Sequence, residues 1–501
     1  ITFWKVTYRR HTNFAMESIE QTFNGQADFG RRVTCTVSRN GDLAYRTYLQ
    51  VTLPEIGQSL SDGEVYARWL DFPGHQLIEN VEVEIGGQRI EKQYGDWMHI
   101  WCQLTMDKNQ EAGYFKMVGN TTQLTFVTDP SYADVDGPCD SSAPRQVCAP
   151  RNALPETTLY VPLQFWFCSN PGLALPLIAL QYHEVKINLD LRAIDECLFA
   201  VSDLAAVSGD GDLKVSTAYA QSLVSASLYV DYVYLDTDER RRMAQNPHEY
   251  LIEQLQYTGA ESVGSSSNKV RLNFNHPCKE LVWVVQPDAN VDYCSSLTGG
   301  ETLYKALGAQ PFNYTDAIDA LPNSIKAFGG PAGTEGPEAF ITNDLFAEAG
   351  AGDVTANASF GGSWNAGTTN SGVSDAGTFV LAETSLDMHC WGENPVVTAK
   401  LQLNGQDRFS EREGTYFDQV QPWQHHSRAP DTGVNVYSFA LRPEEHQPSG
   451  TCNMSRIDNA TLQLVLSNAT VEGTSTAKVR VYARNYNVLR IMSGMGGLAY
   501  S

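Results

Sequence analysis

Histidines that could bind zinc or act as general bases fall at a few places in the sequence. His183 precedes Glu184, which is half of a zinc-protease motif, but no second histidine follows at the required spacing. His425 and His426, together with His446, could bind a metal, although we expect an interface or loop role for them. We expect His183 to be a strand residue near a sheet edge, and no metal at either place.

Other polar clusters imitate binding sites without meeting their spacing. Several aspartates near one loop could hold calcium, but they miss the EF-hand pattern, so we expect a solvated acidic loop. These are Asp129, Asp134, Asp136 and Asp140. Gly494, Gly496 and Gly497 resemble a nucleotide-binding loop, but no helix follows them. Since neither a GxSxG elbow nor a P-loop occurs, the sequence predicts no catalytic residue, no cofactor and no metal, and hence no enzyme.

The cysteines are scattered and form no CxxC pair, so a zinc site of standard spacing is not expected. Most lie in apolar, strand-like runs, where we expect buried thiols. Only Cys139 and Cys148, which flank a loop with proline and aspartate, are placed so that they could form a disulfide. Their redox state stays open, but the overall usage indicates assembly in a reducing compartment.

The charge balance excludes some partners. The chain has 501 residues, with 58 acidic and 35 basic side chains and a net charge of −23. Such a surface repels phosphate, so we expect no direct nucleic-acid binding and no attraction to anionic membranes. No apolar stretch approaches the roughly 20 residues of a membrane span. Arg240, Arg241 and Arg242 form a basic spot, which either pairs with acids across a subunit contact or simply solvates a short helix.

Hydrophobic periodicity indicates that strands position these residues. Apolar and polar side chains alternate in residues 81–85, 185–191 and 462–466, which is typical of half-buried antiparallel strands. Turn signals such as Asn404-Gly405 separate the strands. Helical spacing is scarce and predicts two short helices, one over 97–104 and one over 238–245. Many strands, few helices and frequent turns indicate β-sandwiches or barrels. We expect Phe165, Trp166 and Phe167 to pack in a core or between domains.

The chain also repeats itself. Residues 84–90 (EIGGQRI) resemble 403–409 (LNGQDRF), and an alternating strand follows later in each half, at 185–191 and 462–466. A period this long indicates domain duplication. We predict an N-terminal domain over 1–240 with a long loop at about 105–157. We predict a C-terminal domain over 241–501 with a long Gly-rich outer loop at about 293–384. Loops this long form the exposed face of such domains.

Asn-x-Ser/Thr sequons mark possible glycosylation sites, although each is a weak signal. They are Asn120, Asn313, Asn357, Asn453, Asn459 and Asn468. Asn313 and Asn357 fall in the predicted outer loop. If the chain assembles in the host cytoplasm, lumenal glycosylation enzymes would not meet these sites.

Several longer runs resemble one known family. They are residues 8–18 (YRRHTNFAMES), 38–43 (SRNGDL), 85–88 (IGGQ), 163–168 (LQFWFC), 170–180 (NPGLALPLIAL) and 486–495 (YNVLRIMSGM). Together they resemble major capsid proteins of nucleocytoplasmic large DNA viruses, closest to the phycodnavirus and mimivirus branch, which includes the chlorella virus capsid protein. The resemblance covers roughly residues 1–290 and 395–501, and the run at 170–180 is the most specific. Little in the Gly-rich segment between them is recognisable.

The resemblance implies an all-β double jelly roll, in which two eight-stranded antiparallel sandwiches lie side by side with long surface loops and few short helices. It implies a homotrimeric, pseudo-hexagonal capsomer that tiles an icosahedral shell, as a virion protein assembled in the host cytoplasm. Penton and minor capsid proteins would be partners, and the outer loops could touch the host surface. The first residue, Ile1, falls in what reads as a structured segment, so we expect the family's N-terminal arm to precede it.

Two other functions remain open from the sequence. A minor capsid or spike protein of the same fold would be present in few copies. A β-sandwich carbohydrate-binding module or glycosidase would bind as a monomer, through a concave face with paired carboxylates and exposed aromatics.

Overall fold

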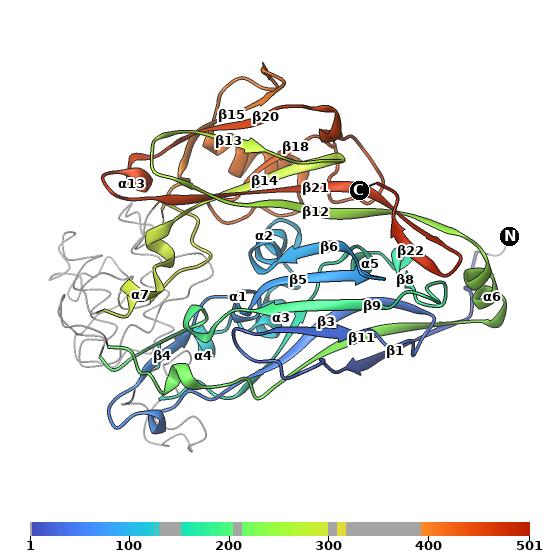
Figure 1. The fold of residues 1–501 in the computed structure, drawn as a ribbon, viewed down its shortest axis with the longest axis horizontal. Coiled ribbons are helices and arrows are strands. Elements are labelled where there is room, and N and C mark those ends of the chain that lie inside the picture. Colours follow the sequence, from blue (N-terminus) through green and yellow to red (C-terminus); the bar gives the residue numbers. More distant parts are fainter. Residues whose placement is uncertain are drawn as a thin grey trace.

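The computed structural model describes residues 3–125, 127–128, 130, 152–203, 213–298, 308–316 and 392–500. Four β-sheet layers are stacked in it (Figure 1). The two layers drawn at the bottom come from the first half of the chain, and the two at the top come from the second half. Each pair of layers encloses its own hydrophobic core, so the chain forms two β-sandwiches that lie side by side.

The first sandwich pairs a five-stranded sheet with a four-stranded sheet. The first sheet has the order β1 (Phe14–Gln21), β11 (Ser225–Leu235), β3 (Leu43–Leu53) and β7 (Thr157–Pro162), and β8 (Leu175–Pro176) also pairs with β3. The second has the order β2 (Arg32–Thr36), β9 (Val185–Leu191), β5 (Ile78–Ile85) and β6 (Gln88–Tyr94). Strands β4 (Tyr66–Trp69) and β10 (Leu198–Val201) form a separate ribbon.

The second sandwich repeats this plan. One sheet has the order β12 (His248–Val263), β21 (Ala477–Met492), β14 (Pro277–Pro287) and β18 (Asn435–Ser438), with β19 (Cys452–Asn453) beside β14 and β22 (Met495–Leu498) beside β21. The other has the order β13 (Ser267–Leu272), β20 (Ala460–Leu466), β15 (Val396–Leu403) and β16 (Gln406–Asp407), with β17 (Arg412–Glu413) beside β15.

Each sheet of the first sandwich therefore has a counterpart with the same strand order in the second sandwich, which confirms the predicted internal repeat. The aligned segments take the same place: β5 and β6 turn at Gly86-Gly87, and β15 and β16 turn at Asn404-Gly405. Both residues of each turn have positive φ. A two-residue hairpin needs such φ values because they match the twist of the flanking strands, and glycine and asparagine adopt them at least cost.

Strand burial follows the period of two. In β20, Leu462, Leu464 and Leu466 are buried in the second core, and the residues between them are half-buried. Strand β14 differs, because it is buried on both faces. Leu281, Trp283 and Val285 face the core of the second sandwich, whereas Val282 and Val284 pack in a third cluster that lies between the sandwiches. This explains its continuous apolar run.

The helices are short. The predicted helices over 97–104 and 238–245 are confirmed as α2 (Gly95–Thr105) and α6 (Thr237–Gln245). The stretch 105–157, predicted as a loop, contains α3 (Glu111–Val118) and α4 (Thr122–Thr125). The remaining short helices include α1 (Pro73–Leu77), α5 (Trp166–Ser169), α7 (Tyr293–Ser296), the π-helical turn η8 (Tyr416–Val420), α12 (Gln421–His425) and α13 (Asn468–Val471). Most of the predicted Gly-rich loop, and the middle of 105–157, lie outside the described residues.

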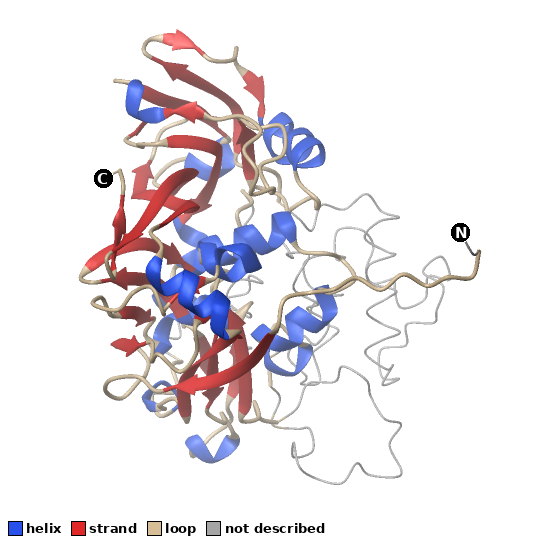
Figure 2. Cartoon of the chain, turned by 90° about the vertical axis from the view of Figure 1, so that its right-hand side faces the viewer, coloured by secondary structure: helices blue, strands red, loops and turns tan. Residues whose placement is uncertain are grey.

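The expectation that the chain starts inside a structured segment is wrong for residues 5–13. These residues form neither helix nor strand, are exposed, and run away from the body before β1 begins (Figure 2). Tyr8 in this segment is exposed, and so is Trp4 directly before it. In the described part of the chain, no helix has the length and apolar character to cross a membrane.

Candidate functional site at the seam between the sandwiches

Helix α2 joins the two sandwiches. It continues directly from β6, and Gly95 makes that turn possible, since a Cβ there would meet the carbonyl oxygens of Ile78 and His75 at 2.1 and 2.2 Å. The helix then lies against the sheet of the second sandwich. Trp97 packs on Tyr482 with ring centroids 5.3 Å apart, and Trp101 lies under the Arg484 guanidinium, 3.9 Å from its Cζ.

An apolar cluster fills this seam. From the first sandwich it takes Phe72, Ile100 and Leu104, and from the second it takes Val282 and Val284, with further aromatic residues from both. Because one close-packed cluster draws on both halves, separating the sandwiches would expose it to water. The two halves therefore form one unit.

Ion pairs cross the seam beside this cluster. Asp96 of α2 lies 3.3 Å from Arg192 of the first sandwich and 3.7 Å from Arg480 of β21. Burial lowers the pKa of Arg480, but the negative charge of Asp96 outweighs it and raises the pKa overall. Arg428 donates to Glu111 of α3 at 2.7 Å. These pairs are partly buried, so water and salt screen them less than surface pairs.

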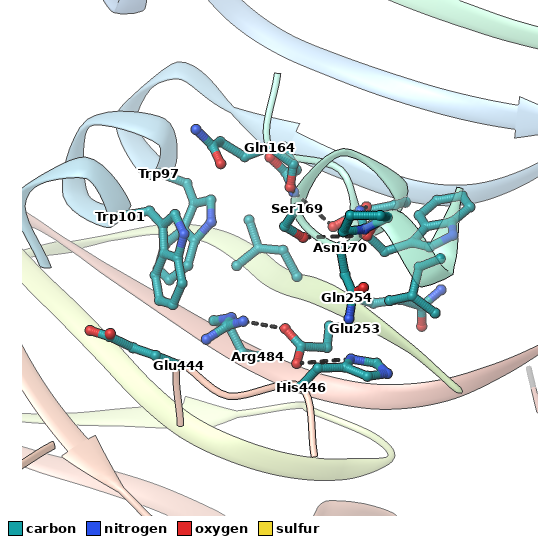
Figure 3. A pocket seen from close by; sticks show the side chains of 16 residues that line it. Trp97, Trp101, Gln164, Ser169, Asn170, Glu253, Gln254, Glu444, His446 and Arg484 are labelled. Atoms are coloured by element: carbon teal, nitrogen blue, oxygen red, sulfur yellow. Dashed lines mark hydrogen bonds and ion pairs between the residues drawn. The ribbon is translucent and has the colours of Figure 1, made fainter. Parts of the chain in front are cut away.

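A charge network of the second sandwich faces the same seam. Glu280 of β14 is fully buried and accepts from His426 Nε2 and Arg484 Nη1, both at 2.9 Å. Glu253 of β12 accepts from Lys279 Nζ at 2.7 Å and from Arg484. Figure 3 shows Glu253 between Arg484 and His446. Neighbouring strands thus present alternating charges that satisfy one another.

The network shifts the pKa values of its members. Burial raises the pKa of Glu280, but the positive charges of His426 and Arg484 outweigh this effect and lower the pKa to about 2. Burial lowers the pKa of His426, but Glu280 and then Glu444 raise it to about 9, so the imidazole is cationic at neutral pH. For Glu91 burial outweighs the hydrogen bonds from Gln93 and the Trp166 backbone, and raises its pKa to about 8.

The predicted histidine residues take different places. His426 is buried in the charge network, His446 lies 3.5 Å from Glu253, and His425 bonds the Leu441 carbonyl at 3.1 Å. We expected His183 to be a strand residue, and this is wrong. It lies in the loop before β9, where its Nδ1 is 3.1 Å from the backbone nitrogen of Gly496. Across the described ranges, no three His, Cys, Asp or Glu side chains gather as metal ligands would.

The three arginines lie on α6, at the end of the molecule where the N-terminal segment starts (Figure 1). Arg240 donates to the buried Asp42 of the same chain at 2.8 Å, which fastens α6 to the first sandwich. Arg241 and Arg242 are exposed. The sequence alone does not distinguish the three arginines, whereas in the structure Arg240 is paired within the chain and Arg241 and Arg242 face solvent.

The sequon asparagines divide by exposure. Asn313 is 2% exposed and its Nδ2 donates to Gln310, and Asn120 is also buried. An enzyme could not reach these amides in the folded chain. Asn453, Asn459 and Asn468 are exposed. Asn357 lies outside the described residues.

The prediction that most cysteines are buried thiols is confirmed where the structure describes them. Five thiols are buried, Cys452 is half-buried and Cys294 is exposed; the buried ones are Cys35, Cys102, Cys168, Cys197 and Cys278. Cys139, Cys148 and Cys390 lie outside the described residues, as do the four aspartates of the predicted acidic loop. Phe165, Trp166 and Phe167 are buried in the first core, as predicted.

The charge network was not predicted from the sequence. The sequence feature that indicates this network is the charged pair Lys279-Glu280, which lies near the start of β14, a strand that is otherwise mostly apolar. Charged side chains are almost never fully buried unless they are paired, so this pair required partners. The sequence could not name those partners, because Arg484 and His426 are distant along the chain.

Comparisons with known proteins match this chain to viral major capsid proteins over nearly its whole length. The family model described as "Large eukaryotic DNA virus major capsid protein" matches residues 239–497, and the model "Major capsid protein N-terminus" matches 2–236. The major capsid protein of Phaeocystis pouchetii virus is 78% identical over 502 residues, covering 100% of this chain and 95% of that protein. That of Chrysochromulina ericina virus is 70% identical over 560 residues, covering 100% and 96%. The solved PBCV-1 virus capsid has a chain with a TM-score of 0.63 at 33% identity, with 100% of both chains covered.

Proposed function

The chain belongs to the large eukaryotic DNA virus major capsid protein family, and from this premise we propose that three copies form a pseudo-hexagonal capsomer. It is a structural protein of the virion, and its fold is the all-β double jelly roll. This family membership argues against the alternative of a carbohydrate-binding module. Both matched family models also describe a major capsid protein, which argues against the alternative of a minor capsid protein.

One observation of this chain carries the trimer proposal: the matching strand orders of the two sandwiches. A trimer of such chains has six similar corners around a threefold axis, so it can occupy a position with six neighbours in a hexagonal lattice. The division near residue 240, between 1–240 and 241–501, is part of this proposal.

The rigid seam supports the same role. A capsomer must keep its two corners at a fixed angle in the lattice, and a shared apolar cluster with ion pairs from Asp96 to Arg480 and from Glu111 to Arg428 would hold them so. Exposed Arg241 and Arg242 could then pair with acids of a neighbouring subunit, whereas Arg240 is already paired with Asp42.

Further parts of the proposal concern partners and place of assembly. The capsomers would form a lattice and meet penton and minor capsid proteins, and their outer loops would face the host surface. We propose no catalytic activity and no cofactor. The five buried, unbridged thiols support assembly in the reducing host cytoplasm. Any glycans would be attached at exposed sites such as Asn453, Asn459 and Asn468 rather than at Asn120 or Asn313.

Imaging of the purified chain by electron microscopy tests the proposal. Class averages viewed along the particle axis should show a threefold particle with a six-cornered outline. Particles with only two lobes, the size of one chain, would contradict it.

A further inference from the structure

The contact between the two sandwiches has a defined place in the repeat. In the first sandwich, α2 and α3 lie between β6 and β7 along the chain. Their apolar residues, Trp97 and Ile100 of α2 and Val118 of α3, belong to the seam cluster together with Val282 of β14 and Tyr482 of β21. The helices that connect these two strands of one sandwich therefore cover the outer face of the β12-β21-β14-β18 sheet of the other.

The second sandwich has helices at the equivalent place. The π-helical turn η8 and α12 lie between β17 and β18, as α2 and α3 lie between β6 and β7. In this segment Trp423 is 80% exposed, and Val420, three residues before it, is 39% exposed. Residues three apart share one side of a helix. The segment thus presents an apolar side to solvent, with a tryptophan at its centre, which is a feature of protein contact sites.

The repeat also indicates the sheet that this tryptophan would meet. It is the β1-β11-β3-β7 sheet, because its strand order matches that of the covered sheet. In the covered sheet, Tyr482 of β21 lies opposite Tyr257 of β12 and Val282 of β14, so the three form one row. Strands β11 and β3 take the places of β21 and β14, and there Tyr229 lies opposite Tyr48.

These tyrosines form an open aromatic row. Tyr229 and Tyr48 are stacked with ring centroids 5.5 Å apart, and Tyr160 of β7 lies 6.2 Å from Tyr48. Core residues such as Leu49 alternate with them along the strands, so the rings point away from the core. The equivalent Tyr482 in the seam is 1% exposed, whereas Tyr160 is 38% exposed and the other two are half-buried. Tyrosine and tryptophan are enriched among the residues that contribute most to binding at protein interfaces.

The charges on the two surfaces are compatible. Glu20 of β1 lies opposite Tyr229, and Asp231 follows Tyr229 by two residues on β11, so carboxylates flank the aromatic row. The chain has 58 acidic side chains, but none of them is in α12. Packing α12 against the row therefore brings no like charges of this helix and the sheet together.

We propose that α12 of one copy packs on the β1-β11-β3-β7 sheet of a second copy, with Trp423 against Tyr229 and Tyr48. Between copies, α12 would then do what α2 does within one chain. A contact that joins two different surfaces forms a ring when its rotation closes, and alternating it with the seam gives a ring of six sandwiches from three chains. This contact rests on the capsomer proposed above, whose copies it would hold together.

The native mass of surface variants tests the contact. Trp423→Glu and Tyr229→Thr should each weaken trimer assembly at least about thirtyfold, because a central aromatic residue supplies much of the stability of an interface. The matched controls, Tyr182→Glu and Tyr182→Thr, change a tyrosine that is 76% exposed in the loop before β9 and should assemble as the wild type does. Circular dichroism verifies the fold of each sample, and Tyr48→Thr replaces Tyr229→Thr if that protein does not fold.

The outcomes separate this contact from the capsomer itself. A monomeric wild-type chain would contradict the capsomer and the contact together. A trimeric wild type beside folded, equally stable trimers of Trp423→Glu and Tyr229→Thr would overturn the contact alone.

Photo-crosslinking shows directly what position 423 touches. The full chain is made with benzoylphenylalanine in place of Trp423 and irradiated as a trimer. Peptide mass spectrometry should find this position joined to residues 43–53 or 225–235 of a second copy. A trimer in which position 423 links to other segments, or to none, would overturn the proposed contact.

Discussion

Replacing Glu280 by glutamine tests the charge network of the seam. The Glu280 carboxylate is fully buried between His426 Nε2 and Arg484 Nη1. Glu280→Gln keeps the size of the side chain but removes its charge, so two cationic groups lose a buried counterion. Removing one partner of a buried ion pair destabilises a protein by about 3–5 kcal/mol.

The pKa of Glu280 gives a second measure of the same interaction. It lies at about 2, against an ordinary value of 4.5. This difference of about 2.5, at about 1.36 kcal/mol for each pKa unit, amounts to about 3 kcal/mol. Because the pKa is lowered by folding, this stabilisation is present above pH 4.5 and is lost as the pH falls towards 2.

Differential scanning calorimetry at neutral pH measures the effect. A loss of about 3 kcal/mol should lower the Tm by about 6–12 °C for domains of this size. The matched control is Glu249→Gln, because Glu249 pairs with Arg490 at 2.7 Å but both side chains are more than half exposed. An exposed pair contributes about 0–1 kcal/mol, so the control should shift the Tm by less than about 4 °C. A folded Glu280→Gln protein with the same Tm as the Glu249→Gln control would refute the reasoning.

Three further predictions concern the core, the pH profile and modification. Phe165→Asp places a charge in the first core, where Phe165 is 0% exposed, and should unfold that sandwich and prevent trimer formation, whereas Tyr182→Asp at an exposed position should not. Circular dichroism and native mass decide this, and a soluble, trimeric Phe165→Asp protein contradicts the core assignment. Stability should fall as the pH rises from 6.5 to about 9, since the raised pKa of His426 stabilises the fold only while the imidazole is protonated. Calorimetry across that range should show a flatter profile for His426→Gln, and an unchanged slope would argue against this role. Peptide mass spectrometry of virions should find Asn313 unmodified because its amide is buried, with Asn453 accessible; a glycan on Asn313 would show that the site is open during assembly.

The sandwich architecture could be predicted because its signals are local. Alternating strands such as β20 and hairpin turns such as Asn404-Gly405 specify their conformation within a few residues. The order of the aligned segments then predicted the duplication, which the matching sheet orders confirm. The double jelly roll itself came from family resemblance, because alternation alone does not distinguish one sandwich topology from another.

The seam could not be predicted because it depends on long-range contacts. Strand β14 reads as one apolar run, and nothing local says that Val282 and Val284 face the other sandwich. The partners of Glu280 lie 146 and 204 residues away along the chain. Asn313 was expected in an exposed loop because it falls in the Gly-rich stretch at about 293–384, yet it is held in a buried turn by Gln310 and Thr315. The start of the chain at Ile1 was expected to lie in a structured segment, yet residues 5–13 form neither helix nor strand and are exposed.

The native mass of the purified chain tests the capsomer proposal most directly. Light scattering behind size exclusion should give a species near three times the 55.3 kDa of one chain, and this species should persist on dilution. A stable trimer is the predicted result. A species of 55.3 kDa at all concentrations would contradict self-assembly into capsomers by this chain alone.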